Sequence, residues 1–159
     1  MSNFEKFYKL LISLAFCQLA GFLGSIATST TVSDWFMALQ KPALMPPGWV
    51  FGVVWTVLFI LMGIALWLVW INGAPVKRKK TALILFGAQW VLNILWSVIF
   101  FSLRELFWSN IELAVLFGLV AATIVYFFKQ SKPAGYLLLP YLLWLCAAAY
   151  LNISIYLLN

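Results

Sequence analysis

Three tryptophans and two amides are the residues of this sequence best suited to chemistry: Trp55, Trp96, Trp144, Gln89 and Asn93. Indole rings offer flat apolar faces, which favour offset stacking on other flat aromatic molecules. An apolar pocket with a few polar groups is the usual character of a small-molecule site. These residue types therefore predict binding of a planar, lipophilic ligand.

Acid–base and metal chemistry find little support in the sequence. Histidine is absent, and the only acids are Glu5, Asp34, Glu105 and Glu112. This inventory provides no catalytic triad, no metal cluster and no relay for an ion-coupled carrier, so neither acid–base catalysis nor ion-coupled transport is expected. A haem held by histidine is excluded, and a metal-free porphyrin fits better than a ligated metal. Glu112 is expected to be a structural partner of Arg104 or of the membrane interface.

The elements that must position these residues are membrane helices. The 159 residues are 65% hydrophobic and 9% charged, with mean hydropathy +1.04, whereas soluble domains carry about 25% charged residues. Five long apolar runs, one of them broken only by Glu112, can each hold the roughly 20 residues that cross a bilayer. Because the runs are continuous and not alternating, they argue against a β-barrel. We predict an all-α membrane bundle, one domain over 1–159, with helices at about 8–29, 47–71, 81–101, 107–128 and 134–157.

The distribution of basic residues predicts the orientation of the bundle, because cytoplasmic loops hold the excess of Lys and Arg. With the N-terminus in the cytoplasm and the C-terminus outside, the outer side has only Lys41 and Arg104. The remaining basic residues lie on the inner side: Lys6, Lys9, Lys77, Arg78, Lys79, Lys80, Lys129 and Lys132. The net charge of +6 therefore requires no nucleic acid to explain it.

The first outer connection, 30–46, is longer than the others and is predicted to form an ordered lid. Ser33 or Asp34 can cap a short helix, WFMALQ, which Pro42 must end, since a residue before proline leaves the α region. Pro46 and its neighbour Pro47 suit the first turn of the second helix, where a missing N–H costs nothing.

Three helices are predicted to direct polar and aromatic faces toward the bundle interior. In the third helix, residues recur at intervals of three and four along one face: Gln89, Asn93, Trp96, Ser97 and Phe100. The second helix contributes Phe51, Trp55 and Phe59, and the fifth contributes Tyr141, Trp144, Ala148, Leu151 or Asn152, and Tyr156. Pro140 should bend the fifth helix and open space beside Trp144. Alternatively, Gln89 and Asn93 simply tie helices together.

The other tryptophans are assigned to the membrane interface, where amphipathic rings settle at headgroup depth. These are Trp35, Trp49, Trp67, Trp70 and Trp108. Trp90 lies off the polar stripe and is expected to face lipid or a partner subunit.

Three segments in order, WFMALQKPALMPPGWVFGVVW, QWVLNILWSVIFF and PYLLWLCAAAYLN, resemble the translocator protein family, whose bacterial members are called tryptophan-rich sensory proteins. The resemblance implies a five-helix bundle, usually a homodimer in a bacterial cell membrane, that binds protoporphyrin IX beneath the first loop. No bound cofactor is otherwise implied. By motif, the implied ligand residues are Trp55, Trp144, Asn93, Trp96, Pro46, Phe59 and Ala148, to which the pocket argument adds Gln89, Leu151 and Phe36.

Two departures from the family limit what the resemblance implies. Phe36 stands where relatives often carry Tyr, so a hydroxyl contact from the lid is lost. No Lys or Arg follows Lys132, so the cholesterol-linked pattern of animal members cannot form and sterol binding is not predicted.

Three functions remain open at this stage: sensing or scavenging of porphyrin, light- and oxygen-dependent porphyrin breakdown with Trp55 or Trp144 as redox partner, and transport of porphyrin or another lipophile. Binding and sensing is favoured, because turnover needs chemistry that the sequence does not show. The first helix also carries small residues at spacings suited to close helix contact, either in a homodimer or within the bundle: Ala20, Gly24 and Thr28, or Gly21 and Ser25.

Overall fold

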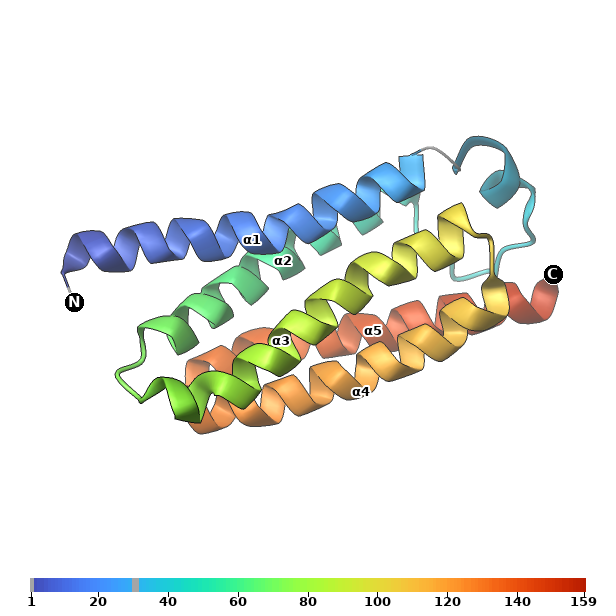
Figure 1. The fold of residues 1–159 in the computed structure, drawn as a ribbon. Helices are drawn as coiled ribbons and strands as arrows, with labels where there is room; N and C mark the ends of the chain where they lie inside the picture. The colour runs from blue at the N-terminus through green and yellow to red at the C-terminus, as the bar shows by residue number, and fades with distance from the viewer. Residues whose placement is uncertain (1, 30–31) are drawn as a thin grey trace.

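The computed structural model describes residues 2–29 and 32–159 (Figure 1). Five helices in it are long and apolar enough to cross a membrane, which confirms the predicted all-α bundle. They are α1 Asn3–Ser29, α2 Gly48–Ile71, α3 Val76–Ser97, α4 Leu106–Gln130 and α5 Lys132–Leu158. Two short π-helical turns complete the fold, η1 at Val32–Phe36 in the first connection and η2 at Val98–Ser102, directly after α3.

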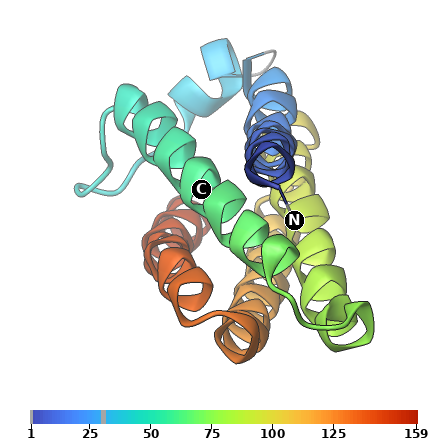
Figure 2. The ribbon, with the colours of Figure 1, turned by 90° about the vertical axis from the view of Figure 1, so that its left-hand side faces the viewer.

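The helices form a closed ring in the order α1, α2, α5, α4, α3, which is visible in the view of Figure 2. Each helix packs on two neighbours, and α3 returns to α1. The two termini lie at opposite ends, as an odd number of spans requires (Figure 1). The interior of the ring is filled by large apolar side chains such as Met62, Phe86, Leu116 and Phe127.

Several helices begin earlier than the apolar runs alone predict. In α1, the Ser2 hydroxyl accepts from the Glu5 N–H at 3.1 Å, and the Glu5 carboxylate accepts from the Ser2 N–H at 2.9 Å. This capping box extends the helix back to Asn3. Similarly, α3 begins at Val76, so the basic run at 77–80 forms its first turns. Lys79 is buried there and donates to the carbonyls of Trp70 and Asn72 at the end of α2.

Close packing of α1 on α2 depends on glycine. A Cβ on Gly63 would lie 3.0 Å from the Leu14 Cα and 3.2 Å from the Ser13 carbonyl oxygen, both of which belong to the α1 backbone. On α1, Ala20 and Gly24 are buried, and a Cβ on Gly24 would lie 3.1 Å from the Ser97 hydroxyl of α3. This small-residue face therefore serves packing within the bundle.

The first connection differs in detail from its prediction. Its helical turn begins at Val32 and continues to Ala38, so it starts before Trp35 and ends ahead of Pro42. The Lys41 ammonium donates to the Met37 carbonyl at 3.3 Å and satisfies one end of this turn. The predicted cap by Ser33 depends on a side chain that lies outside the described part of the chain. Residues 30 and 31, the first two of the predicted 30–46 lid, also lie outside it.

Pro46 and Pro47 precede α2, so the prediction that they form its first turn is wrong. Pro47 is the N-cap, with ψ 146°, and Gly48 is the first helical residue. The extended backbone of Pro47 brings the chain to the helix, and the Pro47 carbonyl accepts from the Val50 N–H at 3.0 Å. The pair therefore acts as a stiff approach to α2.

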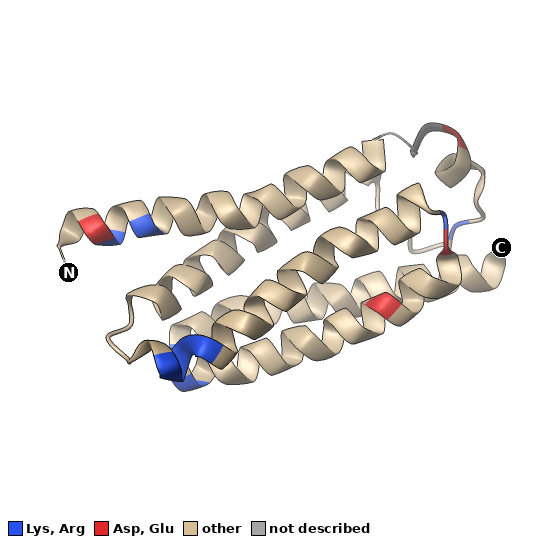
Figure 3. Ribbon diagram, in the orientation of Figure 1, with Lys and Arg blue, Asp and Glu red and all other residues tan. Residues whose placement is uncertain are grey.

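Charges are distributed unevenly along the bundle (Figure 3). Lys and Arg gather at the end that holds the N-terminus and the α2–α3 and α4–α5 connections. At the other end, the chain turns between η2 and α4 at Arg104, whose φ of 60° lies in the left-handed region.

Candidate ligand-binding site

The predicted polar stripe of α3 faces the interior. Gln89, Asn93 and Phe100 are buried, and Trp96 and Ser97 are half-buried. Polar side chains on an otherwise apolar helix turn away from hydrocarbon, so the three- and four-residue spacing predicts this face correctly.

A central contact set joins α2, α3 and α5. The Asn93 amide donates to the Tyr141 hydroxyl at 2.8 Å, and both groups are buried. The Trp55 ring meets the edge of Tyr141 at 6.0 Å between centroids and stacks on Phe59 at 5.5 Å. Four residues from three helices thus form one aromatic and hydrogen-bonded group in the bundle.

A second contact set lies toward the end of α3 and includes the first connection. Trp96 stacks on Phe100 at 5.3 Å, and Phe36 from the connection packs edge-on against Phe100 at 6.1 Å and Phe101 at 5.6 Å. Trp35 also contacts Phe100, at 5.9 Å. The connection therefore rests its two aromatic rings on the helix that carries the polar stripe.

The same connection is also tied to the end of α5. The Gln40 N–H donates to the Asn159 side-chain oxygen at 2.9 Å, and the Asn159 amide donates back to the Gln40 carbonyl at 3.1 Å. Together with the aromatic contacts, this pair holds the connection across one end of the ring, as a lid requires (Figure 1).

Trp144 lies apart from both sets and packs edge-on against Phe51 at 5.8 Å. It lines a groove of about 450 Å³ between α2 and α5, whose walls include Pro140, Val54 and Leu58. The space expected beside Trp144 near Pro140 is therefore present, and it opens between these two helices.

Unpartnered polar atoms mark the interior of the site. The indole N–H groups of Trp96 and Trp144 and both amide atoms of Gln89 are buried without a hydrogen-bond partner among the described residues. Buried polar groups are normally hydrogen-bonded, so such atoms are suited to accept a ligand. Three donor nitrogens and one acceptor oxygen are available in this way, since an amide offers both.

The remaining predicted site residues line the surroundings. Ala148 is half-buried one turn beyond Trp144 along α5 and Leu151 is buried two turns beyond it, whereas Pro46 lies in the approach to α2. Tyr156 is exposed and contacts Phe107 of α4, so it does not share the inward face.

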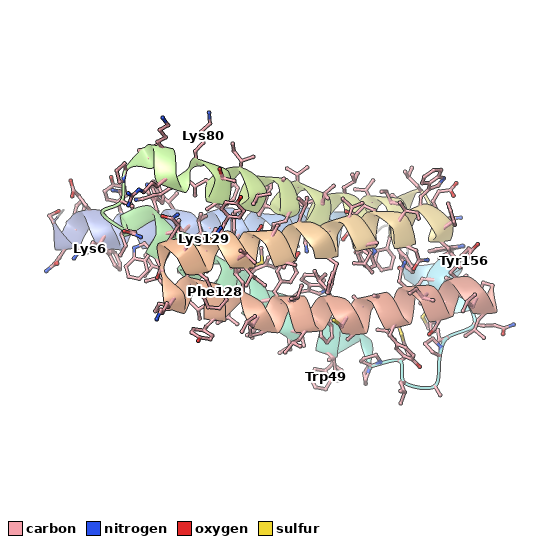
Figure 4. The ribbon with its side chains drawn as sticks, turned by 90° about the horizontal axis from the view of Figure 1, so that it is seen from below. Lys6, Trp49, Lys80, Phe128, Lys129 and Tyr156 are labelled. Carbon is pink, nitrogen blue, oxygen red and sulfur yellow. The ribbon has the colours of Figure 1, made fainter. Side chains whose placement is uncertain are left out.

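Three of the five tryptophans assigned to the membrane interface are exposed. Trp49 is 71% exposed and points away from the bundle (Figure 4), and Trp70 and Trp108 are also exposed. Trp90 was expected to face lipid or a partner subunit. Instead, its ring stacks on Phe16 of α1 at 4.5 Å and its N–H donates to the Phe16 carbonyl at 3.0 Å. It is a tie between α1 and α3.

Two further residues complete the contact sets although they were not predicted as ligand residues. Tyr141 follows Pro140 and shares the inward face of Trp144, a signal that the sequence carried. No such signal marked Phe101, because an ideal α-helix would turn its side chain away from that of Phe100. In η2 the wider π-helical turn places both rings against Phe36.

Comparison with known proteins places this arrangement in a family. The sequence profile of the TspO/MBR family matches residues 13–158, which includes all the contact sets described above. The chain belongs to the TspO/MBR family. The TspO/MBR profile covers α2 to α5 completely and begins at Ser13, within α1.

Relatives of this TspO/MBR chain match over most of their length. The "Tryptophan-rich protein TspO" of Archaeoglobus fulgidus is 41% identical over 151 residues, which cover 95% of this chain and 97% of the relative. The protein of the same name from Chlorobaculum tepidum is 37% identical over 98% of both chains. The "Translocator protein" of Homo sapiens is 37% identical over 85% of this chain and 80% of its own length. The chain is accordingly a multi-pass membrane protein.

Proposed function

We propose that this protein binds porphyrins such as protoporphyrin IX inside the bundle and acts as a membrane-embedded sensor for them. The observation that carries the proposal is the aromatic set around Trp55 and Tyr141, together with the unpartnered N–H groups of Trp96 and Trp144. Indole and phenol rings offer stacking surfaces to a flat macrocycle. The unpartnered N–H groups suit its carboxylates or ring nitrogens.

The first connection supports the same proposal. Its rings Trp35 and Phe36 rest on Phe100, and Gln40 is bonded to Asn159, so the connection can cover a ligand and hold it. In this arrangement the groove beside Trp144 gives the ligand a route from the bilayer between α2 and α5. In a sensor, the bound ligand must change a surface that other molecules can reach. Here that surface is the first connection, which covers the ligand.

The test is quenching of tryptophan fluorescence by protoporphyrin IX in the purified protein in detergent or nanodiscs. The Trp55→Phe, Trp144→Phe double variant keeps an aromatic ring at each position but removes both indoles. We expect its affinity for protoporphyrin to fall about tenfold or more, since each aromatic contact is worth about 1 kcal/mol. A matched Trp49→Phe, Trp108→Phe variant changes two exposed indoles and should bind as the unaltered protein does. Equal affinity of the two double variants would remove the site assignment.

A further inference from the structure

A second groove lies away from the proposed porphyrin site, between η2 and the beginning of α4. Its volume is about 340 Å³. It is lined by Ile99, Leu103, Glu105, Trp108, Ile111 and Glu112. None of these belongs to the aromatic contact sets, so the groove requires an explanation of its own.

Glu112 is the unusual residue of this groove. It is only 8% exposed, and neither carboxylate oxygen has a hydrogen-bond partner among the described residues. It lies six residues after the first residue of α4, about 9 Å along the helix. An isolated carboxylate in apolar surroundings is costly, and acids inside membrane spans typically mark functional positions.

The neighbouring groups do not relieve this cost. The Asn110 amide donates to the Leu106 carbonyl at 2.8 Å, and the Asn152 amide donates to the Ser109 hydroxyl at 3.0 Å. The Arg104 guanidinium lies over the Trp35 ring, 5.8 Å from its centroid. The expected pairing of Glu112 with Arg104 is therefore not what the structure shows, and the groove is lined by two acids and no basic residue.

We propose that this groove binds a lipophilic amine. The ammonium group donates to the Glu112 carboxylate, while the apolar body lies along Leu103, Trp108 and Ile111. These three side chains are exposed, so a ligand dissolved in the bilayer reaches the groove from the side. An anionic molecule would be repelled by Glu105, and a neutral one would give Glu112 no charged partner.

The exposed Trp108 ring adds a second contact suited to a cation. Ammonium groups are attracted to the face of an indole within about 6 Å of the ring centroid. An amine held between this ring and Glu112 would satisfy both. The groove therefore selects for charge through the acid and for an apolar body through its walls.

The experiment compares two fluorescent probes with the same skeleton, dansylcadaverine and its hydroxyl analogue, in which an alcohol replaces the amine. Binding is followed by dansyl anisotropy at pH 7 in nanodiscs of phosphatidylcholine, whose zero net charge limits non-specific attraction of the amine. We expect the unaltered protein to bind the amine about tenfold or more tightly than the alcohol, as a charge-assisted hydrogen bond predicts. Equal affinities would overturn the proposal without any variant.

Variants locate the preference. Glu112→Gln should bring the two affinities together and leave that of the alcohol unchanged, whereas Asp34→Asn, which neutralises an exposed acid in the first connection, should retain the full preference. Ile111→Trp fills the groove at an exposed position and should weaken both probes while Glu112 remains. A preference that survives Glu112→Gln or disappears in Asp34→Asn would reject the groove. Unchanged affinities for both probes in Ile111→Trp would also reject it. No porphyrin is present, so the outcome is separate from that of the proposed function.

Discussion

At the scale of single residues, the hydrogen bond between Asn93 and Tyr141 is the central polar contact of the bundle. It joins α3 to α5 across the ring, and the phenol that accepts it also packs against Trp55. A bond of this kind fixes the ring of Tyr141 in place. The aromatic set around Trp55 consequently depends on one amide.

Replacing Tyr141 by Phe should destabilise the protein by about 1 kcal/mol, because it leaves the buried Asn93 amide without its acceptor while the ring packing is kept. The measurement is the free energy of unfolding in mixed micelles as sodium dodecyl sulfate is added. Tyr136→Phe in the same helix removes a hydroxyl from an exposed ring and should have no effect. If both variants unfold at the same detergent fraction as the parent, the bond contributes nothing.

The site residues differ in how far the sequence predicts them. Gln89, Asn93 and Trp96 could be assigned to the interior because polar groups in an apolar run leave few alternatives. The lack of a partner for Glu112 could not be predicted, since Arg104 is near enough along the chain to pair with it. Trp90 was also beyond prediction, because its bond goes to a carbonyl of α1 that no side-chain pattern reveals.

At the scale of elements, the α1–α2 pair shows how closely two helices can approach. Gly63 lies directly against the backbone of α1 at Leu14. Small residues at such positions increase dispersion contacts between membrane helices, where the hydrophobic effect offers no gain. Gly118 of α4 has no such neighbour, since a Cβ there would meet nothing within 4 Å.

These two glycines give a matched test of helix packing. Gly63→Ala should cost about 1–3 kcal/mol, because the added methyl group meets backbone atoms that cannot yield without separating the helices. Gly118→Ala should be neutral or stabilise by up to about 1 kcal/mol through its better helix propensity. Thermal unfolding in one detergent compares them directly. A Gly63→Ala protein as stable as Gly118→Ala would show that the contact adjusts freely.

The elements were predictable in number and class but not in their ends. Apolar length reveals a span, whereas the start of α1 depends on a capping box formed by polar residues before the span. The π-helical turn η2 has no glycine or proline to signal it in VIFFS. Its wider turn accompanies packing of the first connection on Phe100 and Phe101, which is tertiary information.

At the scale of the whole molecule, the uneven distribution of basic residues predicts the orientation in the membrane. Lys and Arg gather at the end holding the N-terminus (Figure 3), and such ends remain in the cytoplasm. The first connection and the groove of Glu112 then lie on the opposite side. Both proposed ligand sites are accordingly predicted to be nearer the outer surface.

Cysteine labelling of intact cells tests this orientation. In a background of Cys17→Ala and Cys146→Ala, Met37→Cys in the exposed first connection should react with a membrane-impermeant maleimide, and Lys80→Cys should react only after lysis. Labelling of Lys80→Cys in intact cells, with Met37→Cys protected, would show the reverse orientation.

The ring order has a consequence for how the protein is made. Because α5 packs between α2 and α4, the ring closes only when α5, the last of these five helices along the chain, is in place. Until it inserts, α2 and α4 each lack a neighbour, and Asn93 has no phenol to bond. The chain therefore completes the ring of these five helices only after α5 has inserted.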